Sequence, residues 1–406
     1  MHMKHWIGLV VLAIATFTGV LPAQADVVTD ANARAAEIAS KLPATPPAVR
    51  VMAYVQVSVF EAVNAITGRY PPLMAKINAA PGASVDAAVA AATRTALMKL
   101  MPPAHQPAID ADYEAALKLV PDGPAEANGI AIGEQAAAGC LARVDEGLTV
   151  PDTYRPHTAA GVYVPTMLPA VPNWGKRKPW AMSSGSQFRP SPPPGLTSNE
   201  WTRDYNEIKA LGSATSTART PEQTEIARFW ATNLPDVHLG LARSVATAAG
   251  REVTRNARLY AAVAAAMNET EISVFEAKYH YLFWRPITAV RNGDRDENSA
   301  TDRDADWVPL IATPMQPEYP CAHCMLAATI ATVLRAEAGG SSALALSTTS
   351  NTARGVTRRW ASTDAVVQEV SMARIWAGVH YRTSTEAGNR MGEQVGTLVA
   401  AAYGLH

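Results

Sequence analysis

The stretch Glu276-Ala-Lys-Tyr-His-Tyr-Leu-Phe-Trp-Arg-Pro286 sets two cations among aromatic and apolar residues. Lys278 and Arg285 are seven residues apart, which is two turns along one face of an α-helix. Two cations on such a helix are costly to bury unless an anion meets them. Alternatively, both are ordinary surface cations whose stems lie on the protein and whose charges reach the solvent. The segment alone leaves both interpretations open.

Helical patterns extend along most of the chain. From Asn32 to about Arg143 the sequence is rich in alanine, with apolar residues at helical spacing, and strand patterns are nearly absent. Between about Val150 and Ser198, many prolines exclude long helices, and Ser198 is a candidate cap where helices resume. The sequence therefore predicts a mainly α fold, with helical halves at 26–150 and 199–406 joined by an ordered Pro-rich loop at 151–198.

The N-terminus carries a pattern typical of export. Met1-His-Met-Lys-His5 is followed by an apolar run from Trp6 to Leu21 and then by Ala23-Gln-Ala25. This order of basic, apolar and small residues predicts a secretory signal peptide over residues 1–25. No other stretch of the sequence stays apolar long enough to indicate a membrane span, so we expect a periplasmic or secreted protein. The net charge of −1 gives no indication of nucleic acid as a partner.

A short internal repeat relates the two halves. Ser58-Val-Phe-Glu-Ala62 recurs identically as Ser273-Val-Phe-Glu-Ala277. If the repeat reflects a duplication, Lys278 and Arg285 correspond to Val63 and Tyr70, so only the second half carries the charged residues. Chance or a shared helix preference explains a match of this length equally well.

A second segment of interest is Pro317-Glu-Tyr-Pro-Cys-Ala-His-Cys-Met-Leu-Ala-Ala328. Pro320 stands where a helix can begin, Met325 to Arg335 is strongly apolar, and Gly339-Gly340 is a stop signal. The backbone N–H groups near Cys321 and Ala322 would then lie at a helix N-terminus, where an oxyanion binds readily, with His323 beside them. A lone histidine in such a position is also compatible with a purely structural role.

The third segment runs from Ser371 to Glu386 and contains Arg374, Gly378 and His380. His380 follows Arg374 by six residues, which is about 240° around an unbroken helix. The two side chains can converge only if the helix breaks, and Gly378 offers the break. Thr383-Ser-Thr-Glu386 has the pattern of a capping box that opens the last helix. A C-terminal capping histidine is the alternative interpretation of His380.

Together the three segments resemble the signature shared by vanadium-dependent haloperoxidases, type-2 phosphatidic-acid phosphatases and bacterial acid phosphatases. That signature is Lys, six residues, Arg-Pro; then Pro-Ser-Gly-His; then Ser-Arg, three residues, Gly, one residue, His, three residues, Asp. The matching residues here are Lys278, Arg285, Pro286, Pro320, His323, Arg374, Gly378 and His380. The wider context, including Trp284 and Pro317-Glu-Tyr-Pro320, is more similar to the soluble bacterial haloperoxidase branch than to the lipid phosphatases.

The resemblance implies an all-α fold of two helical bundles with one vanadate or phosphate site in the second. Lys278, Arg285 and Arg374 would hold the oxyanion, with backbone N–H groups near Cys321 and Ala322 as further donors. His380 would bond the vanadium of vanadate, or the phosphorus as a nucleophile, and His323 would be the acid–base group. The implied substrates are hydrogen peroxide and halide, or a phosphomonoester, so haloperoxidase is the first expectation and acid phosphatase the alternative.

The chain departs from the signature at several positions. Cys321 replaces serine, Ala322 replaces glycine, Ser384 replaces the final aspartate, and Ala373 stands where serine precedes the arginine. A free thiol beside peroxide should oxidise, which counts against a peroxidase unless a Cys321–Cys324 disulfide protects it. Both cysteines are equally compatible with small buried residues.

Two further interpretations of the cysteine segment are weaker, and one further class of function stays open. No βαβ pattern supports a thioredoxin-like site, and zinc lacks further ligands because Cys140 is isolated. A non-catalytic periplasmic protein that binds an oxyanion is the expectation if the departures abolish turnover.

Overall fold

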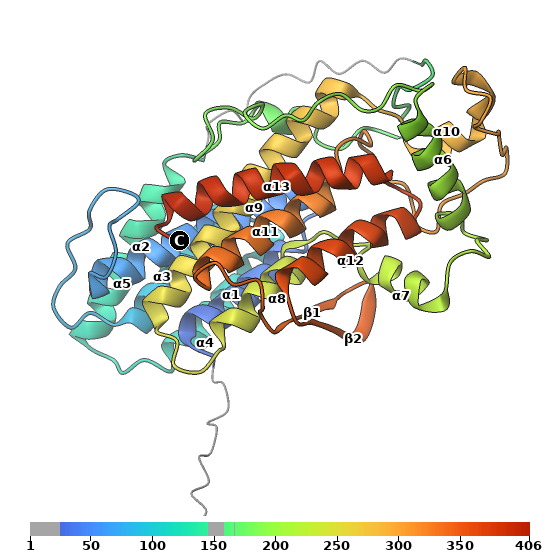
Figure 1. Cartoon of the computed structure of the whole chain (residues 1–406). Coiled ribbons are helices and arrows are strands. Elements are labelled where there is room, and N and C mark those ends of the chain that lie inside the picture. The colour runs from blue at the N-terminus through green and yellow to red at the C-terminus, as the bar shows by residue number, and fades with distance from the viewer. Residues whose placement is uncertain (1–24, 145–157, 166) are drawn as a thin grey trace, which may run out of the picture.

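The computed structural model describes residues 25–144, 158–165 and 167–406 (Figure 1). The predicted signal peptide lies almost entirely outside the described residues, so it stays a prediction. The described chain is mostly helical, which confirms the all-α prediction. Its α-helices are α1 (Val27–Ala39), α2 (Thr45–Thr67), α3 (Val85–Leu100), α4 (Gln106–Leu117), α5 (Pro124–Leu141), α6 (Asn199–Leu211), α7 (Pro221–Phe229), α8 (Pro235–Ala246), α9 (Val253–Tyr281), α10 (Pro286–Arg291), α11 (Ala322–Glu337), α12 (Thr363–Trp376) and α13 (Arg382–Ala402).

The long helix α9 is the centre of the described fold. It packs against α2 from the N-terminal half and against α11 and α13 from the C-terminal half (Figure 1). Helix α2 also packs against α3 and α5, and side chains from all these helices form one continuous apolar core. Helix α2 has the length and composition of a membrane span, which the sequence analysis did not count, but most of it is buried inside the protein. The domain division at residues 150 and 198 stays a prediction.

The helices that follow α9 lie close together because small residues face one another. Helix α13 packs against α11, and α12 packs against both (Figure 1). A Cβ atom at Gly392 of α13 would lie 2.3 Å from the carbonyl oxygen of Met325 in α11. Only glycine permits this approach, which brings the N-terminal ends of α11 and α13 together.

The described part of the Pro-rich segment is anchored to α9 by hydrogen bonds. The Glu269 carboxylate accepts the backbone N–H groups of Trp180, Ala181 and Met182 at 2.8 to 3.0 Å. Further bonds join Tyr279 Oη to the Ala170 carbonyl and pair Arg189 with Glu276. Upstream, Tyr163 N–H donates to the Leu282 carbonyl at 2.7 Å, and Trp284 N–H donates to the Gly161 carbonyl at 3.0 Å. These last two bonds seat residues 161–163 on the turn that follows α9.

A β-hairpin between α11 and α12 was not predicted. Strands β1 (Leu346–Ser350) and β2 (Ala353–Trp360) pair antiparallel, and Leu346 lies opposite Trp360. Trp360 packs near Trp230, and Thr348 Oγ1 donates to the Val237 carbonyl, so the hairpin covers the start of α8. Two short strands rely on pairing and packing rather than on a strong sequence pattern.

Candidate active site

Three buried cations lie at the ends of three helices. Lys278 is in the last turn of α9, Arg285 caps the N-terminus of α10, and Arg374 is in the last turn of α12. Each is at most 1% exposed. The interpretation of Lys278 and Arg285 as surface cations is therefore wrong, because the turn after α9 folds both side chains inward.

The side chains of Lys278 and Arg285 are held by backbone carbonyl groups of the segment before α11. Lys278 Nζ donates to the carbonyl oxygens of Pro317 and Glu318 at 2.9 and 2.8 Å. Arg285 Nε donates to the Gln316 carbonyl at 2.8 Å, and its Nη1 donates to the Val379 carbonyl at 2.8 Å. Arg374 Nη1 donates to the Trp230 carbonyl. These contacts fix the positive charges in space without neutralising them.

His380 lies between two helices, as predicted. Helix α12 ends at Trp376, and Gly378 adopts a left-handed conformation with φ of 77°. The break turns His380 toward Arg285, whose Nη1 lies 3.3 Å from His380 Nε2. Since an arginine can only donate, Nε2 presents its lone pair and Nδ1 carries the proton.

The predicted capping box of the last helix is wrong. Helix α13 begins at Arg382, one residue before Thr383, and its N-cap Tyr381 makes no side-chain capping bond. Asp204 from α6 accepts the Thr383 N–H at 3.0 Å instead. A carboxylate distant in sequence thus takes the place of the local cap.

Glu318 is a site residue that the sequence analysis missed. Its Oε1 lies 2.8 Å from His380 Nδ1 and accepts the Tyr381 N–H at 3.1 Å. The residue is fully buried, and burial raises the pKa of its carboxyl to about 7, although Arg285 and Lys278 oppose the rise. Glu318 therefore supplies the carboxylate that the signature places four residues after the histidine, where this chain has Ser384. Its position directly before Tyr319-Pro320 offered no local signal for this contact.

His323 stands in the first turn of α11 and is 8% exposed. Burial lowers its pKa well below the usual range, and the charges of Arg374 and Lys278 lower it further. A hydrogen bond to the backbone of Thr232 acts in the opposite direction. Its Nε2 atom is buried without a hydrogen-bond partner among the described residues. A neutral imidazole with an unengaged nitrogen can take up a proton.

Cys321 is the N-cap of α11 and forms a disulfide with Cys324. Its backbone N–H donates to the Ser384 carbonyl at 3.2 Å, so the Cys321 N–H that was expected to hold the oxyanion is engaged elsewhere. The Ala322 N–H belongs to the first turn, where a helix offers no internal acceptor, and it remains the donor of this segment. The disulfide also excludes the interpretation of Cys321 and Cys324 as two small free thiols.

The cluster formed by Lys278, Arg285, Arg374, His323 and His380 fits an anion with several oxygens. Burial lowers the pKa of Lys278 well below its usual range, that of Arg285 to about 10 and that of Arg374 to about 9. Burial and these neighbouring cations also lower the pKa of His380. Arg285 Nη2, Arg374 Nε and Arg374 Nη2 are buried without a partner among the described residues. Unpaired guanidinium N–H groups of this kind are suited to a tetrahedral oxyanion such as vanadate or phosphate.

The described residues give no indication of a site for a divalent metal ion. Among the described residues, no group of three or more His, Cys, Asp or Glu side chains could hold a metal ion. The three cations and two histidines of this cluster are instead residue types suited to holding an anion. The roles of the individual residues stay predictions.

Known proteins share this fold. The bacterial vanadium-dependent iodoperoxidase structure superposes with a TM-score of 0.81 at 22% identity, over 92% of this chain and 95% of that chain. An apo-type bacterial vanadium-dependent chloroperoxidase gives 0.71 at 15% identity, over 89% and 95%. Vanadium chloroperoxidase of Curvularia inaequalis is 28% identical over 214 residues, or 44% of this chain and 34% of that protein. The chain thus matches about a third of the length of this curated relative.

Residues 258–404 match the family model described as the VCPO second helical-bundle domain. This range contains α11, α12 and α13, most of α9, and all five residues of the cluster. The part of the chain that carries the three segments of the signature is therefore similar to the second helical-bundle domain of the VCPO family model and to vanadium chloroperoxidase.

Proposed function

We propose that this protein is a vanadate-dependent haloperoxidase, which oxidises halide with hydrogen peroxide to hypohalous acid. In this reaction hydrogen peroxide transfers one oxygen to the halide as a hydroxyl group. Its other oxygen takes up a proton and leaves as water. The observation that carries the proposal is the set of unpartnered, buried N–H groups on Arg285 and Arg374 around the lone pair of His380. The match of residues 258–404 to the VCPO second helical-bundle domain supports it.

Different residues of the cluster would hold different atoms of the cofactor. Vanadate, when bound, supplies a Lewis acid that activates hydrogen peroxide. Lys278, Arg285 and Arg374 would hold its negative oxygens, and His380 Nε2 would be the protein ligand of its central atom. Glu318 fixes the His380 proton on Nδ1 and so keeps Nε2 available. Phosphate fits the same donors.

His323 would move the protons. Its low pKa keeps the imidazole neutral near pH 7, so Nε2 can accept a proton from hydrogen peroxide and return it to the departing water. The disulfide supports peroxidase chemistry, because Cys321 then carries no thiol for peroxide to oxidise.

The deciding experiment compares the purified full chain with and without orthovanadate. We expect peroxide-dependent oxidation of halide only after orthovanadate has been added. Hydrolysis of a phosphomonoester without halide oxidation would instead identify an acid phosphatase with a phosphohistidine intermediate. Tight vanadate binding without either activity would identify a protein that only binds oxyanions.

Two histidine variants separate the proposed roles. His380→Ala should abolish halide oxidation and weaken vanadate binding, whereas His323→Ala should reduce turnover by about 100-fold or more and largely retain binding. His280→Ala, an exposed histidine of α9, is the control and should retain both properties. Calorimetric titration with vanadate measures binding, and an equal loss of affinity in both variants would contradict the assignment.

We also infer that the protein is exported, on the basis of the N-terminal pattern from Met1 to Ala25. N-terminal sequencing of protein recovered from the periplasm or the medium should begin after Ala25. Recovery of full-length protein from the cytoplasm alone would contradict this inference.

A further inference from the structure

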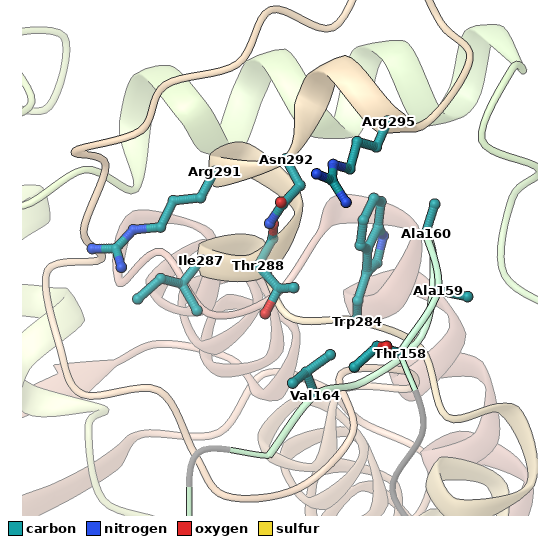
Figure 2. Close-up of a pocket in the computed structure, with 10 residues that line it drawn as sticks. All are labelled: Thr158, Ala159, Ala160, Val164, Trp284, Ile287, Thr288, Arg291, Asn292 and Arg295. Atoms are coloured by element: carbon teal, nitrogen blue, oxygen red, sulfur yellow. The ribbon is translucent and has the colours of Figure 1, made fainter.

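A cavity of about 430 Å³ lies beside the turn that carries Arg285. Figure 2 shows the side chains around it. They come from residues 158–164, from the turn after α9, from α10 and from the residues that follow α10. Val164, Ile287 and the indole of Trp284 give it apolar walls. Arg291, Arg295 and Asn292 line it as well, and none of the described lining residues is acidic. Its volume is that of a site for a small organic molecule.

This cavity is adjacent to the candidate active site. A second cavity of about 380 Å³ includes Arg285 in its lining. The two cavities share Val164, Ile287 and Thr288, so they meet along these three side chains. A molecule in the first cavity therefore lies next to the cavity that Arg285 lines.

Trp284 offers an unengaged hydrogen-bond donor at the cavity wall. The residue is 1% exposed and stacks on Trp201 with ring centres 5.7 Å apart, so one face is already covered. Its indole Nε1–H is buried and has no partner among the described residues. A buried tryptophan N–H normally finds an acceptor, so this group is a polar atom left unsatisfied next to the cavity.

The charges at the cavity are positive. The Arg291 guanidinium points away from Trp284 in Figure 2, and its Nε donates to the Trp307 carbonyl at 2.8 Å. Arg295 is exposed, and no ion pair or hydrogen bond of its side chain is found within the described part of the chain. The neighbouring acids face elsewhere, because Asp296 accepts from Trp201 and Thr301, and Asp294 lies 3.9 Å from Arg303.

We propose that this cavity binds the organic acceptor of the reaction, an aromatic molecule that carries a carboxylate or a phenolate. The ring packs against Val164, Ile287 and the edge of Trp284, and the anionic group is held by Arg295, whose side chain points toward Trp284 in Figure 2. The proposal rests on the proposed haloperoxidase function. A ring carbon takes the halogen from hypohalous acid, the ring loses a proton, and the hydroxyl oxygen leaves as water with that proton.

Binding is tested without the cofactor, by calorimetric titration of the full chain with para-hydroxybenzoate and with neutral para-hydroxybenzamide. We expect the anion to bind more tightly, and Arg295→Gln to weaken its binding by about threefold to tenfold with little effect on the amide. Arg359→Gln removes an exposed arginine of β2, far along the chain from the cavity, and should bind the anion as the wild type does. Ile287→Trp fills the cavity and should reduce binding of both probes.

A second measurement uses the vanadate-loaded protein with bromide and peroxide. The ratio of halogenated benzoate to halogenated benzamide should fall in Arg295→Gln and stay unchanged in Arg359→Gln. Equal binding of both probes to the wild type and to Arg295→Gln would overturn the proposal, even if halide oxidation is present. Charge-dependent binding without any halide oxidation would instead overturn the proposed function and retain the site as an aromatic-anion site.

Discussion

Helices α2 and α9 pack against each other and carry the same five residues, yet only one of them contributes to the candidate site (Figure 1). Ser58-Val-Phe-Glu-Ala62 and Ser273-Val-Phe-Glu-Ala277 are buried in both helices, apart from a partly exposed Glu276. The next position is Val63 in α2 and Lys278 in α9, and both side chains are fully buried. The pentapeptide thus serves helix packing in both places, and the chemistry comes from the residues around it.

The comparison extends two residues upstream. Gln56 of α2 corresponds to Glu271 of α9, and each is 1% exposed. Burial raises the pKa of Glu271 to about 8, and the charge of Lys278 opposes the rise. Two buried ionisable groups, Glu271 and Lys278, therefore occupy positions of α9 at which α2 has an amide and an apolar side chain.

The largest effect should follow from placing the α9 residue in α2. Val63→Lys buries a cation on the helix face that it shares with Val59, Phe60 and Ile66, so we expect a loss of about 3–5 kcal/mol in the free energy of unfolding. Urea denaturation measures the loss, and Val63→Met controls for side-chain size. A stability equal to that of Val63→Met would show that α2 tolerates the charge, which would break the comparison.

The reverse exchange should affect the site rather than the fold. Lys278→Val removes one charged donor, so vanadate affinity should fall by about 10- to 100-fold, the value of one charge-assisted hydrogen bond. Calorimetric titration with vanadate gives the affinity, and Lys99→Val, an exposed lysine of α3, is the control. Unchanged affinity in Lys278→Val, with native helical content, would remove Lys278 from the site.

The smallest effect concerns the upstream pair. The folded state holds a proton on Glu271 up to about pH 8, whereas an unfolded glutamate loses it near 4.5, so this group destabilises the protein as pH rises between these values. Glu271→Gln copies the α2 residue and should remove that slope. We expect the stabilities to be most similar at about pH 5 and the variant to gain on the wild type as the pH rises toward 9, with the gain levelling off above the folded-state pKa. Parallel stability curves for the two proteins would contradict the raised pKa.

The sequence was informative where chemistry depends on order and spacing. Lys278, Arg285, His323, Arg374 and His380 were predicted because their spacing forms a signature, and the structure brings them together. The break at Gly378 followed from helical geometry alone. Glu318 was missed because its partner His380 is 62 residues away and is reached only through packing. The start of α13 was missed for the same reason, since Asp204 of α6 caps it from a distance.

Two backbone hydrogen bonds hold residues 161–163 on the turn after α9. They affect how the sequence of this segment can evolve. They join Tyr163 to Leu282 and Gly161 to Trp284 through main-chain atoms only. Mutation at a neighbouring position such as Val164 can therefore alter the shape and polarity of the wall without releasing it from the turn. The range of accepted molecules can drift while the residues around His380 stay fixed, so new specificities can evolve here without passing through an inactive ancestor.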